Sequence, residues 1–226
     1  MGTVYNSLKT VSDGNIVHLD AANKRSYNGS GVTWLDLSKN NNNGTLENGT
    51  KFITSKPNYF SFDGVNDDMY VTSSFFTSVP QVFTLEFCHY DLGSGCQFIC
   101  RGNTSQGWSI ENSKFSIFNH QSSYDLISTP YTTPNKFYHT VCILNGANFK
   151  RYVNNVLIND VTLSNTSRTN TNTNKMYVNL DIGINGTVVP GSYRNSGISI
   201  IRVYDRSLNV NEINQNYLSV SGRYGI

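Results

Sequence analysis

The sequence predicts an all-β protein, either a two-sheet sandwich or a closed barrel, with one short helix late in the chain. Three observations support this prediction. Short segments with alternating apolar residues follow one another at regular spacing. Glycine and asparagine residues that favour turns separate these segments. Helical periodicity is confined to a single segment, which is the pattern of a sandwich or barrel rather than of an α/β fold.

The predicted strands share period-two alternation or enrichment in β-branched and aromatic residues. They cover residues 15–20, 59–62, 68–71, 82–90, 97–101, 108–111, 114–118, 136–144, 148–158, 176–183 and 197–205. Turn pairs such as Asp63-Gly64 and Asn145-Gly146 lie between them, and Asn154-Asn155 predicts a hairpin inside the 148–158 segment. The sequence predicts a long ordered loop at residues 26–50. Its expected anchors are Trp34, Leu35, Leu37 and Leu46.

The helix is predicted in SLNVNEINQNYLS, residues 207–219. Asn209 is the expected N-cap, and Glu212 lies three residues later, as a capping box requires. Gly222 is expected to end the helix. The expected buried stripe consists of Val210, Ile213, Tyr217 and Leu218.

Composition limits the classes of function. A chain of 226 residues suits one domain, residues 1–226. Charged residues make up 14% of the chain, the net charge is +2, and Lys and Arg are scattered, which argues against nucleic acid and against an anionic membrane surface. No apolar segment approaches the roughly 18 residues of a membrane span, and no apolar secretory region follows the first residues. We therefore expect no membrane insertion and no secretion signal.

The four cysteines are expected to be reduced thiols. Cys88 and Cys142 lie inside predicted strands, where a buried thiol behaves as a small apolar side chain. Cys96 and Cys100 lack the second pair that a zinc site needs, so zinc is not expected. A Cys96–Cys100 disulfide is the alternative.

The stretch FSFDGVNDDMYV, residues 60–71, has two interpretations. In the first, which we favour, Asp63-Gly64 makes a turn and the following polar side chains bond to its backbone. In the second, the stretch binds calcium, which prefers hard oxygen ligands. The candidate ligands are Asp63, Asn66, Asp67 and Asp68. No other cofactor is expected.

Several loops combine aromatic residues with amide and charged residues, as a sugar-binding surface does. The same composition is expected on the surface of any soluble sandwich, so the pattern alone leaves both interpretations open. The candidate carbohydrate-binding residues are Tyr124, Asp125, Tyr193, Arg194 and Asn195.

Taken together, six segments in order along the chain resemble the concanavalin A-like lectin/glucanase superfamily, and specifically the laminin-G-like jelly-roll domains found in bacteriophage structural proteins and bacterial surface proteins. The segments are 15–46, 60–71, 83–90, 136–158, 180–187 and 198–217. This resemblance implies a two-sheet antiparallel jelly-roll sandwich with a concave front sheet, and it assigns His139 a packing role.

The resemblance also implies a function. The leading hypothesis is a non-enzymatic bacteriophage virion protein, either a capsid decoration protein or a fibre or adhesin module, made in the host cytoplasm. Its partners would be other capsid or fibre proteins and host-surface glycans. The alternative is a carbohydrate-binding module of a surface protein. A glycoside hydrolase is the least favoured hypothesis, because no acid of the chain begins the E-x-D-x-x-E pattern of hydrolytic relatives.

Overall fold

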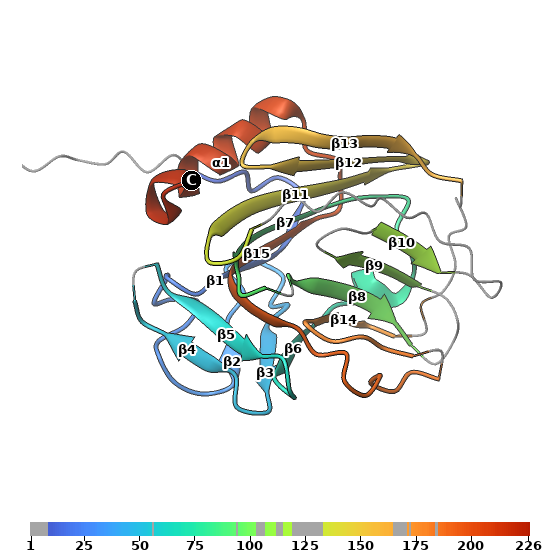
Figure 1. The fold of residues 1–226 in the computed structure, drawn as a ribbon. Helices are drawn as coiled ribbons and strands as arrows, with labels where there is room; N and C mark the ends of the chain where they lie inside the picture. The colour runs from blue at the N-terminus through green and yellow to red at the C-terminus, as the bar shows by residue number, and fades with distance from the viewer. Residues whose placement is uncertain are drawn as a thin grey trace, which may run out of the picture.

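A computed structural model confirms the all-β architecture with one helix near the end of the chain (Figure 1). It describes residues 9–55, 57–93, 95–102, 107–111, 115–118, 133–164, 171, 173–183 and 185–226. The strands form two antiparallel sheets that face each other, as expected for a jelly-roll sandwich.

The larger sheet has eight strands. Its order is β13 (Val156–Thr162), β12 (Asn148–Val153), β11 (Phe137–Asn145), β7 (Val82–Asp91), β15 (Asn195–Tyr204), β5 (Tyr59–Asp63) and β4 (Lys51–Ile53). The eighth strand, β1 (Asn15–Asp20), pairs with the far end of β15, beside the stretch that pairs with β5. Segments from both ends of the sequence therefore meet in one sheet.

The smaller sheet has seven strands. Its order is β10 (Phe115–Phe118), β9 (Gly107–Glu111), β8 (Gln97–Arg101), β14 (Lys175–Val178), β6 (Asp68–Thr72), β3 (Gly44–Glu47) and β2 (Thr33–Trp34). A single 3₁₀ turn, η1 (Ser74–Thr77), follows β6.

Alternation decides which side chains fill the space between the sheets. On β7, Phe83, Leu85 and Phe87 are buried in the main core, and the residues between them point to the outer side. On the smaller sheet, Met69 of β6 and Met176 of β14 enter the same core. Alternation along β7 therefore separates a core side from an outer side.

The prediction for residues 26–50 is only partly right. This segment contributes the short strands β2 and β3 rather than remaining a loop. Trp34 and Leu46 are buried anchors as expected, whereas Leu35 is 47% exposed. The strands were missed because two to four residues are too few to show a period.

The strand predicted at 176–183 ends at Val178. Asn179 takes a left-handed conformation with φ of 67°, which stops the strand. Beyond it the chain leaves the ladder, and an isolated bridge joins Ile182 to Val188.

The helix α1 (Val210–Tyr224) begins as predicted. Asn209 caps it and Glu212 completes the capping box. Its end is not as predicted, since Gly222 lies inside the helix and Gly225 provides the left-handed cap.

The buried side of α1 also differs from the expected stripe. Val210 and Leu218 are 61% and 50% exposed, and Tyr217 is half-buried. The buried residues are Ile213, Asn216, Val220 and Tyr224. The stripe was assigned from apolar residues alone, and it missed Asn216, whose amide is the contact that orients the helix.

Asn216 belongs to a buried polar cluster between α1 and the outer side of the larger sheet. Glu86 of β7 is fully buried at its centre. Arg202 of β15 donates to Glu86 Oε1, and His139 Nε2 lies 2.9 Å from the same oxygen. Asn216 Nδ2 donates to Glu86 Oε2 at 2.7 Å. Although burial alone would raise the pKa of Glu86, Arg202 and His139 hold it at about 2.

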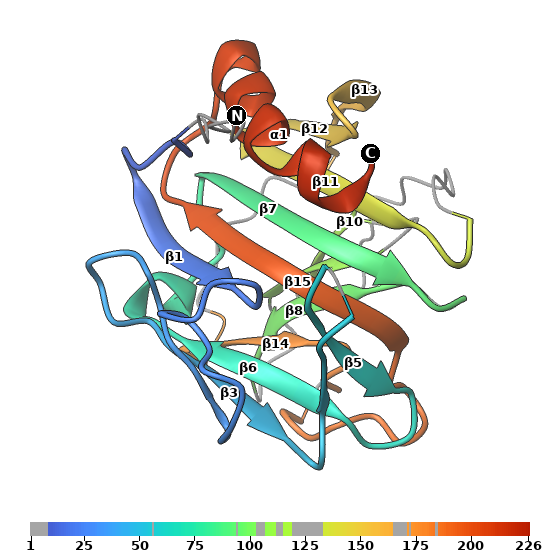
Figure 2. The same cartoon turned by 90° about the vertical axis from the view of Figure 1, so that its left-hand side faces the viewer.

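The same cluster holds the two ends of the described chain in place. Asn216 Oδ1 accepts a bond from the backbone N–H of Val11 at 2.8 Å. Near the end of α1, Arg223 Nη1 donates to both carboxylate oxygens of Asp20 on β1, at 2.9 and 2.8 Å. Figure 2 shows α1 lying against this sheet, near β7 and β11. The packing role expected for His139 is consistent with its full burial in this cluster.

The four cysteines are buried free thiols. Burial raises the pKa of each of them, so they stay protonated near neutral pH. Within the described ranges, no helix has the length and apolar character needed to cross a membrane.

We expect Glu86→Gln to destabilise the fold strongly. The change leaves the buried Arg202 guanidinium without its counter-charge, which costs about 3–5 kcal/mol. Urea denaturation at neutral pH measures this loss. The matched control is Asp160→Asn, which breaks the exposed Lys150–Asp160 pair at 3.2 Å and should cost less than about 1 kcal/mol. Equal losses in the two variants would contradict the central role of Glu86.

Candidate functional site

The outer side of the seven-stranded sheet carries a pair of tyrosines on neighbouring strands. Since Met69 and Met176 point into the core, the adjacent Tyr70 of β6 and Tyr177 of β14 point outward. They are cross-strand partners, their ring centroids are 6.2 Å apart, and both are half-exposed. Lys175 Nζ lies 3.7 Å from the centroid of the Tyr70 ring. A cation is thus held beside an aromatic pair.

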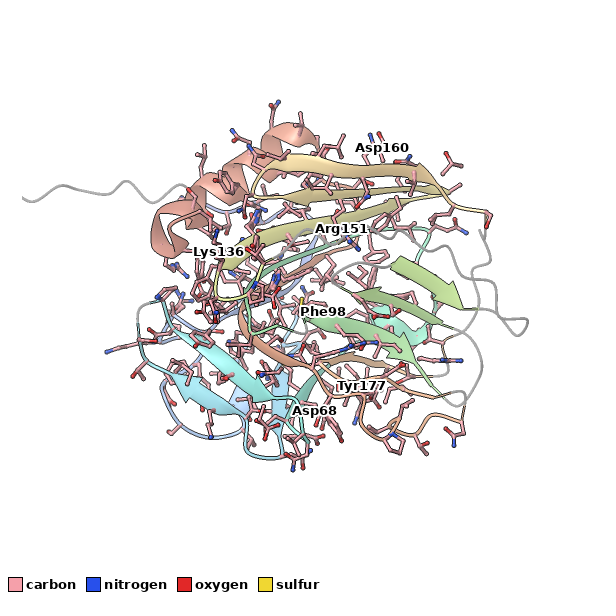
Figure 3. The ribbon with its side chains drawn as sticks, viewed as in Figure 1. Asp68, Phe98, Lys136, Arg151, Asp160 and Tyr177 are labelled. Atoms are coloured by element: carbon pink, nitrogen blue, oxygen red, sulfur yellow. The ribbon has the colours of Figure 1, made fainter. Side chains whose placement is uncertain are left out.

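A loop that follows β14 covers the neighbouring part of this side. Leu180 and Ile182 pack on Ile99 of β8, and both Tyr177 and Tyr193 pack against this cluster. Arg194 fastens the loop, because Nε donates to Gln97 Oε1 at 3.1 Å and Nη2 donates to Glu111 Oε2 at 3.2 Å. The loop therefore adds a third tyrosine, Tyr193, to this side of the sheet. Figure 3 labels Tyr177 and Asp68, which belong to the same region.

Two carboxylates border the tyrosines. Glu47 of β3 and Asp68 of β6 are cross-strand partners on the outer side of the sheet. Glu47 is exposed, whereas Asp68 is buried and accepts a bond from Asn48 Nδ2 at 3.0 Å. Burial raises the pKa of Asp68 to about 6, with a smaller contribution from the charge of Glu47. The pKa of Tyr193 is also raised, mainly by burial and to a smaller extent by the negative charges of Asp68 and Glu47.

We name this surface the tyrosine face. It consists of Glu47, Asp68, Tyr70, Lys175, Tyr177 and Tyr193. Its aromatic rings offer apolar contact, and its carboxylates and ammonium group offer hydrogen bonds in both directions.

The acid-rich stretch predicted as a turn or a calcium site lies at the border of the tyrosine face. Asp63 Oδ1 accepts backbone N–H bonds from Val65 at 2.8 Å and from Asn66 and Asp67 at 3.3 and 3.4 Å. These bonds lower the pKa of Asp63. Asp67 Oδ2 accepts a bond from the N–H of Asp63 at 3.2 Å. The hydrogen bonds are those of a closed turn.

Of the four candidate calcium ligands, Asp63 and Asn66 are exposed, and Asp67 and Asp68 are buried. Asp68 turns to the tyrosine face, away from the turn that Asp63 organises. Over the part of the chain that the structure describes, no three His, Cys, Asp or Glu side chains gather as a metal site would require. Calcium binding at this turn stays a prediction.

The structure brings the calcium candidates and part of the carbohydrate candidates together, which sequence spacing did not predict. Asn195 begins β15 directly opposite Asp63 of β5. Gly64 permits this approach, since it has φ of 77° and an added Cβ would lie 3.1 Å from the backbone nitrogen of Asn195. Tyr193 lies beside Asp68 through the loop described above. Tyr124 and Asp125 fall outside the described residues.

Sequence reasoning missed Tyr70, Tyr177 and Lys175. Their signal was present, because KMYV and DMYV each place an aromatic residue between two core residues of a short strand. What the sequence did not show is that β6 and β14 are neighbours, which makes two isolated tyrosines a pair.

Comparisons with known proteins agree with this fold. A family model of the laminin-G type, described as Concanavalin A-like lectin/glucanases superfamily, matches residues 89–214. A comparison with curated protein sequences gave no match.

Similar solved structures are binding domains of botulinum neurotoxins. One is of botulinum neurotoxin type C, whose entry into cells depends on interaction with two ganglioside molecules. It has 17% identity and a TM-score of 0.67, and the match covers 93% of this chain and 52% of the other. Another is the serotype D ligand binding domain in complex with N-acetylneuraminic acid, with 14% identity and a TM-score of 0.67, covering 92% and 51%. The chain spans about half the length of these structures. Likeness at this level of identity shows the shared fold.

We expect Asp68→Asn to stabilise the protein at neutral pH. Because the pKa of Asp68 is higher in the folded than in the unfolded state, the folded state binds its proton more tightly. Ionisation of Asp68 therefore costs stability as the pH rises from the unfolded pKa of about 4, and the full cost is present above pH 6. The uncharged amide of the variant avoids this cost, so its free energy of unfolding should be about 1–2 kcal/mol higher at pH 7.5.

The advantage should shrink as the pH falls from 6 through the unfolded pKa of about 4, and it should vanish below about pH 3, where the wild-type carboxyl is protonated in both states. Thermal melting of both proteins over this range measures the difference. A constant difference at every pH would contradict a raised pKa at Asp68.

Proposed function

The chain belongs to the concanavalin A-like lectin/glucanase superfamily, and from this premise we propose that it is a non-enzymatic module that binds carbohydrate at the tyrosine face. The observation that carries the proposal is the half-exposed pair of Tyr70 and Tyr177, with the Lys175 ammonium group held over one ring. The apolar side of a sugar ring packs on such aromatic rings, and its hydroxyl groups bond to charged neighbours.

The charges on the tyrosine face can serve both kinds of hydrogen bond that a sugar hydroxyl makes. Glu47 is an exposed acceptor, and Lys175 is a donor that is only half-buried. Arg194 is already bonded to Gln97 and Glu111, so we assign it a positioning role, holding the loop that carries Tyr193.

One structural neighbour comes from a toxin whose entry into cells depends on gangliosides, and another is in complex with N-acetylneuraminic acid. Those statements concern the toxins, and the toxin chains in these structures are about twice as long as this chain. For this chain they support including sialylated glycans among the ligands that are tested.

A binding role is favoured over hydrolysis by the burial of Asp68. Glycosidases need two carboxyl groups that both reach the scissile bond. Glu47 and Asp68 are neighbours, but Asp68 is only 3% exposed and its carboxylate is bonded to Asn48. Release of reducing sugar from a polysaccharide by the purified chain would overturn the non-enzymatic proposal.

We expect Tyr177→Ala to weaken glycan binding. Loss of one stacking ring should raise the Kd for a bound glycan about fivefold to tenfold. A glycan array that includes neutral and sialylated sugars identifies the ligand, and titration calorimetry measures the Kd. Lys150→Ala, an exposed change on the other sheet, is the control and should leave the Kd unchanged.

Two results would contradict this proposal: an array without any bound glycan, or equal Kd values for Tyr177→Ala and the wild type. Repeating the titration with a calcium chelator also tests the calcium hypothesis. Weaker binding and a lower melting temperature in the chelator are expected if Asp63 and its neighbours hold the ion.

We further propose the virion context predicted from the sequence, as a capsid decoration or a fibre component. The low charge of 14% and the polar, uncharged surface support repeated weak contacts within a protein lattice. Mass spectrometry of purified particles of the encoding phage should detect the chain. A copy number that matches the capsid lattice favours decoration, a low copy number favours a fibre, and absence from the particle contradicts both.

A further inference from the structure

The outer side of the eight-stranded sheet carries a second aromatic surface, beyond the end of α1. Tyr59, Tyr90 and Phe137 lie there as a cluster of half-exposed rings. The Tyr90 and Phe137 centroids are 4.8 Å apart, and Tyr59 is 5.5 Å from Tyr90. Phe137 also contacts Tyr224 in the last turn of α1, at 5.1 Å. The helix thus covers one edge of the cluster and leaves the rest uncovered.

A glycine makes this arrangement possible. Gly197 lies near the start of β15, opposite Tyr90 of β7. An added Cβ would lie 2.5 Å from Cδ2 of Tyr59 and 3.0 Å from Cβ of Tyr90. Glycine inside a strand weakens it, and it commonly marks a place of close approach. Here the missing side chain allows the two tyrosine rings to lie side by side on the sheet.

Next to these rings is a hollow of about 540 Å³, within the range of small-molecule sites. Tyr90, Phe137 and Tyr224 line it from the sheet and the helix. Its polar lining comes from Asn135, Lys136 and Asn154 (Figure 3 labels Lys136 just before β11, on the side where α1 ends). Asn154 is fixed by its Oδ1, which accepts the N–H of His139 at 2.9 Å.

We propose that this hollow binds the ring of a neutral sugar, as a second site on the sheet opposite to the tyrosine face. The exposed ring surfaces suit the apolar side of a pyranose. The amide groups of Asn135 and Asn154 suit its hydroxyl groups, whereas an acyl chain would leave them without partners. Lys136 is exposed at the border of the hollow, and the partial negative charge at the C-terminal end of α1 opposes its charge. An acidic sugar therefore gains little attraction there and would still lose hydration of its carboxylate.

This second site does not depend on the tyrosine face, because different residues on different sheets form the two. Its test is a titration of the full chain with methyl β-glucopyranoside, followed by two-dimensional amide NMR. Saturable shifts are expected for the residues around Asn135, Phe137 and Tyr90. N-acetylneuraminic acid should shift them more weakly at equal concentration.

Two variants make the test specific. Tyr90→Ala should raise the Kd obtained from the titration of these shifts about fivefold. Asn135→Gly removes the amide while tolerating the left-handed backbone at that position, where φ is 65°, and should also weaken binding. Tyr177→Ala is the control and should leave these shifts unchanged.

Three outcomes would overturn the second site. They are the absence of saturable shifts in the wild type, shifts that persist unchanged in both Tyr90→Ala and Asn135→Gly, and stronger binding of N-acetylneuraminic acid than of the neutral glycoside. Binding that is lost in Tyr177→Ala and kept in Tyr90→Ala would assign the sugar to the tyrosine face alone. The failures of the two proposals are therefore distinguishable.

Discussion

The fold depends on the burial of one carboxylate. Glu86 lies at the centre of the larger sheet and below α1, without access to water. An unpaired buried charge would cost several kcal/mol, so its oxygens must meet donors from elsewhere in the chain. Arg202 provides one from β15, His139 another from β11, and Asn216 a third from the helix. The hydrogen bond from Asn216 to Glu86 thereby helps to fix the helix on the sheet in one position.

That position decides which surfaces stay open. α1 covers the outer side of the larger sheet over Glu86 and ends at Tyr224, so the rings of Tyr90 and Phe137 stay partly uncovered. On the smaller sheet, the loop held by Arg194 covers Ile99 and stops beside Tyr177. In both sheets a covering element ends next to tyrosines. The lengths of α1 and of the loop held by Arg194 therefore decide where the two candidate surfaces lie.

The two surfaces differ in their electrostatic surroundings. The tyrosine face combines the acids Glu47 and Asp68 with the ammonium group of Lys175. The hollow on the opposite sheet has amides, the exposed Lys136 at its border and the partially negative end of a helix. Aromatic stacking is similar in the two places and gives little selectivity, so the charged and amide groups decide which sugars bind.

The sequence by itself determined the longer strands, the hairpin at Asn154-Asn155 and the start of the helix, because these follow from alternation, turn chemistry and capping within a few residues. It also supplied Tyr193, which the structure sets beside Asp68. It could not determine the buried side of α1, since Asn216 faces inward only because Glu86 is there to receive it. Nor could it pair Tyr70 with Tyr177, which lie over one hundred residues apart in sequence and meet only because β6 and β14 are neighbours. Local patterns fix what each segment becomes, whereas contacts between distant segments exist only once the two sheets have formed.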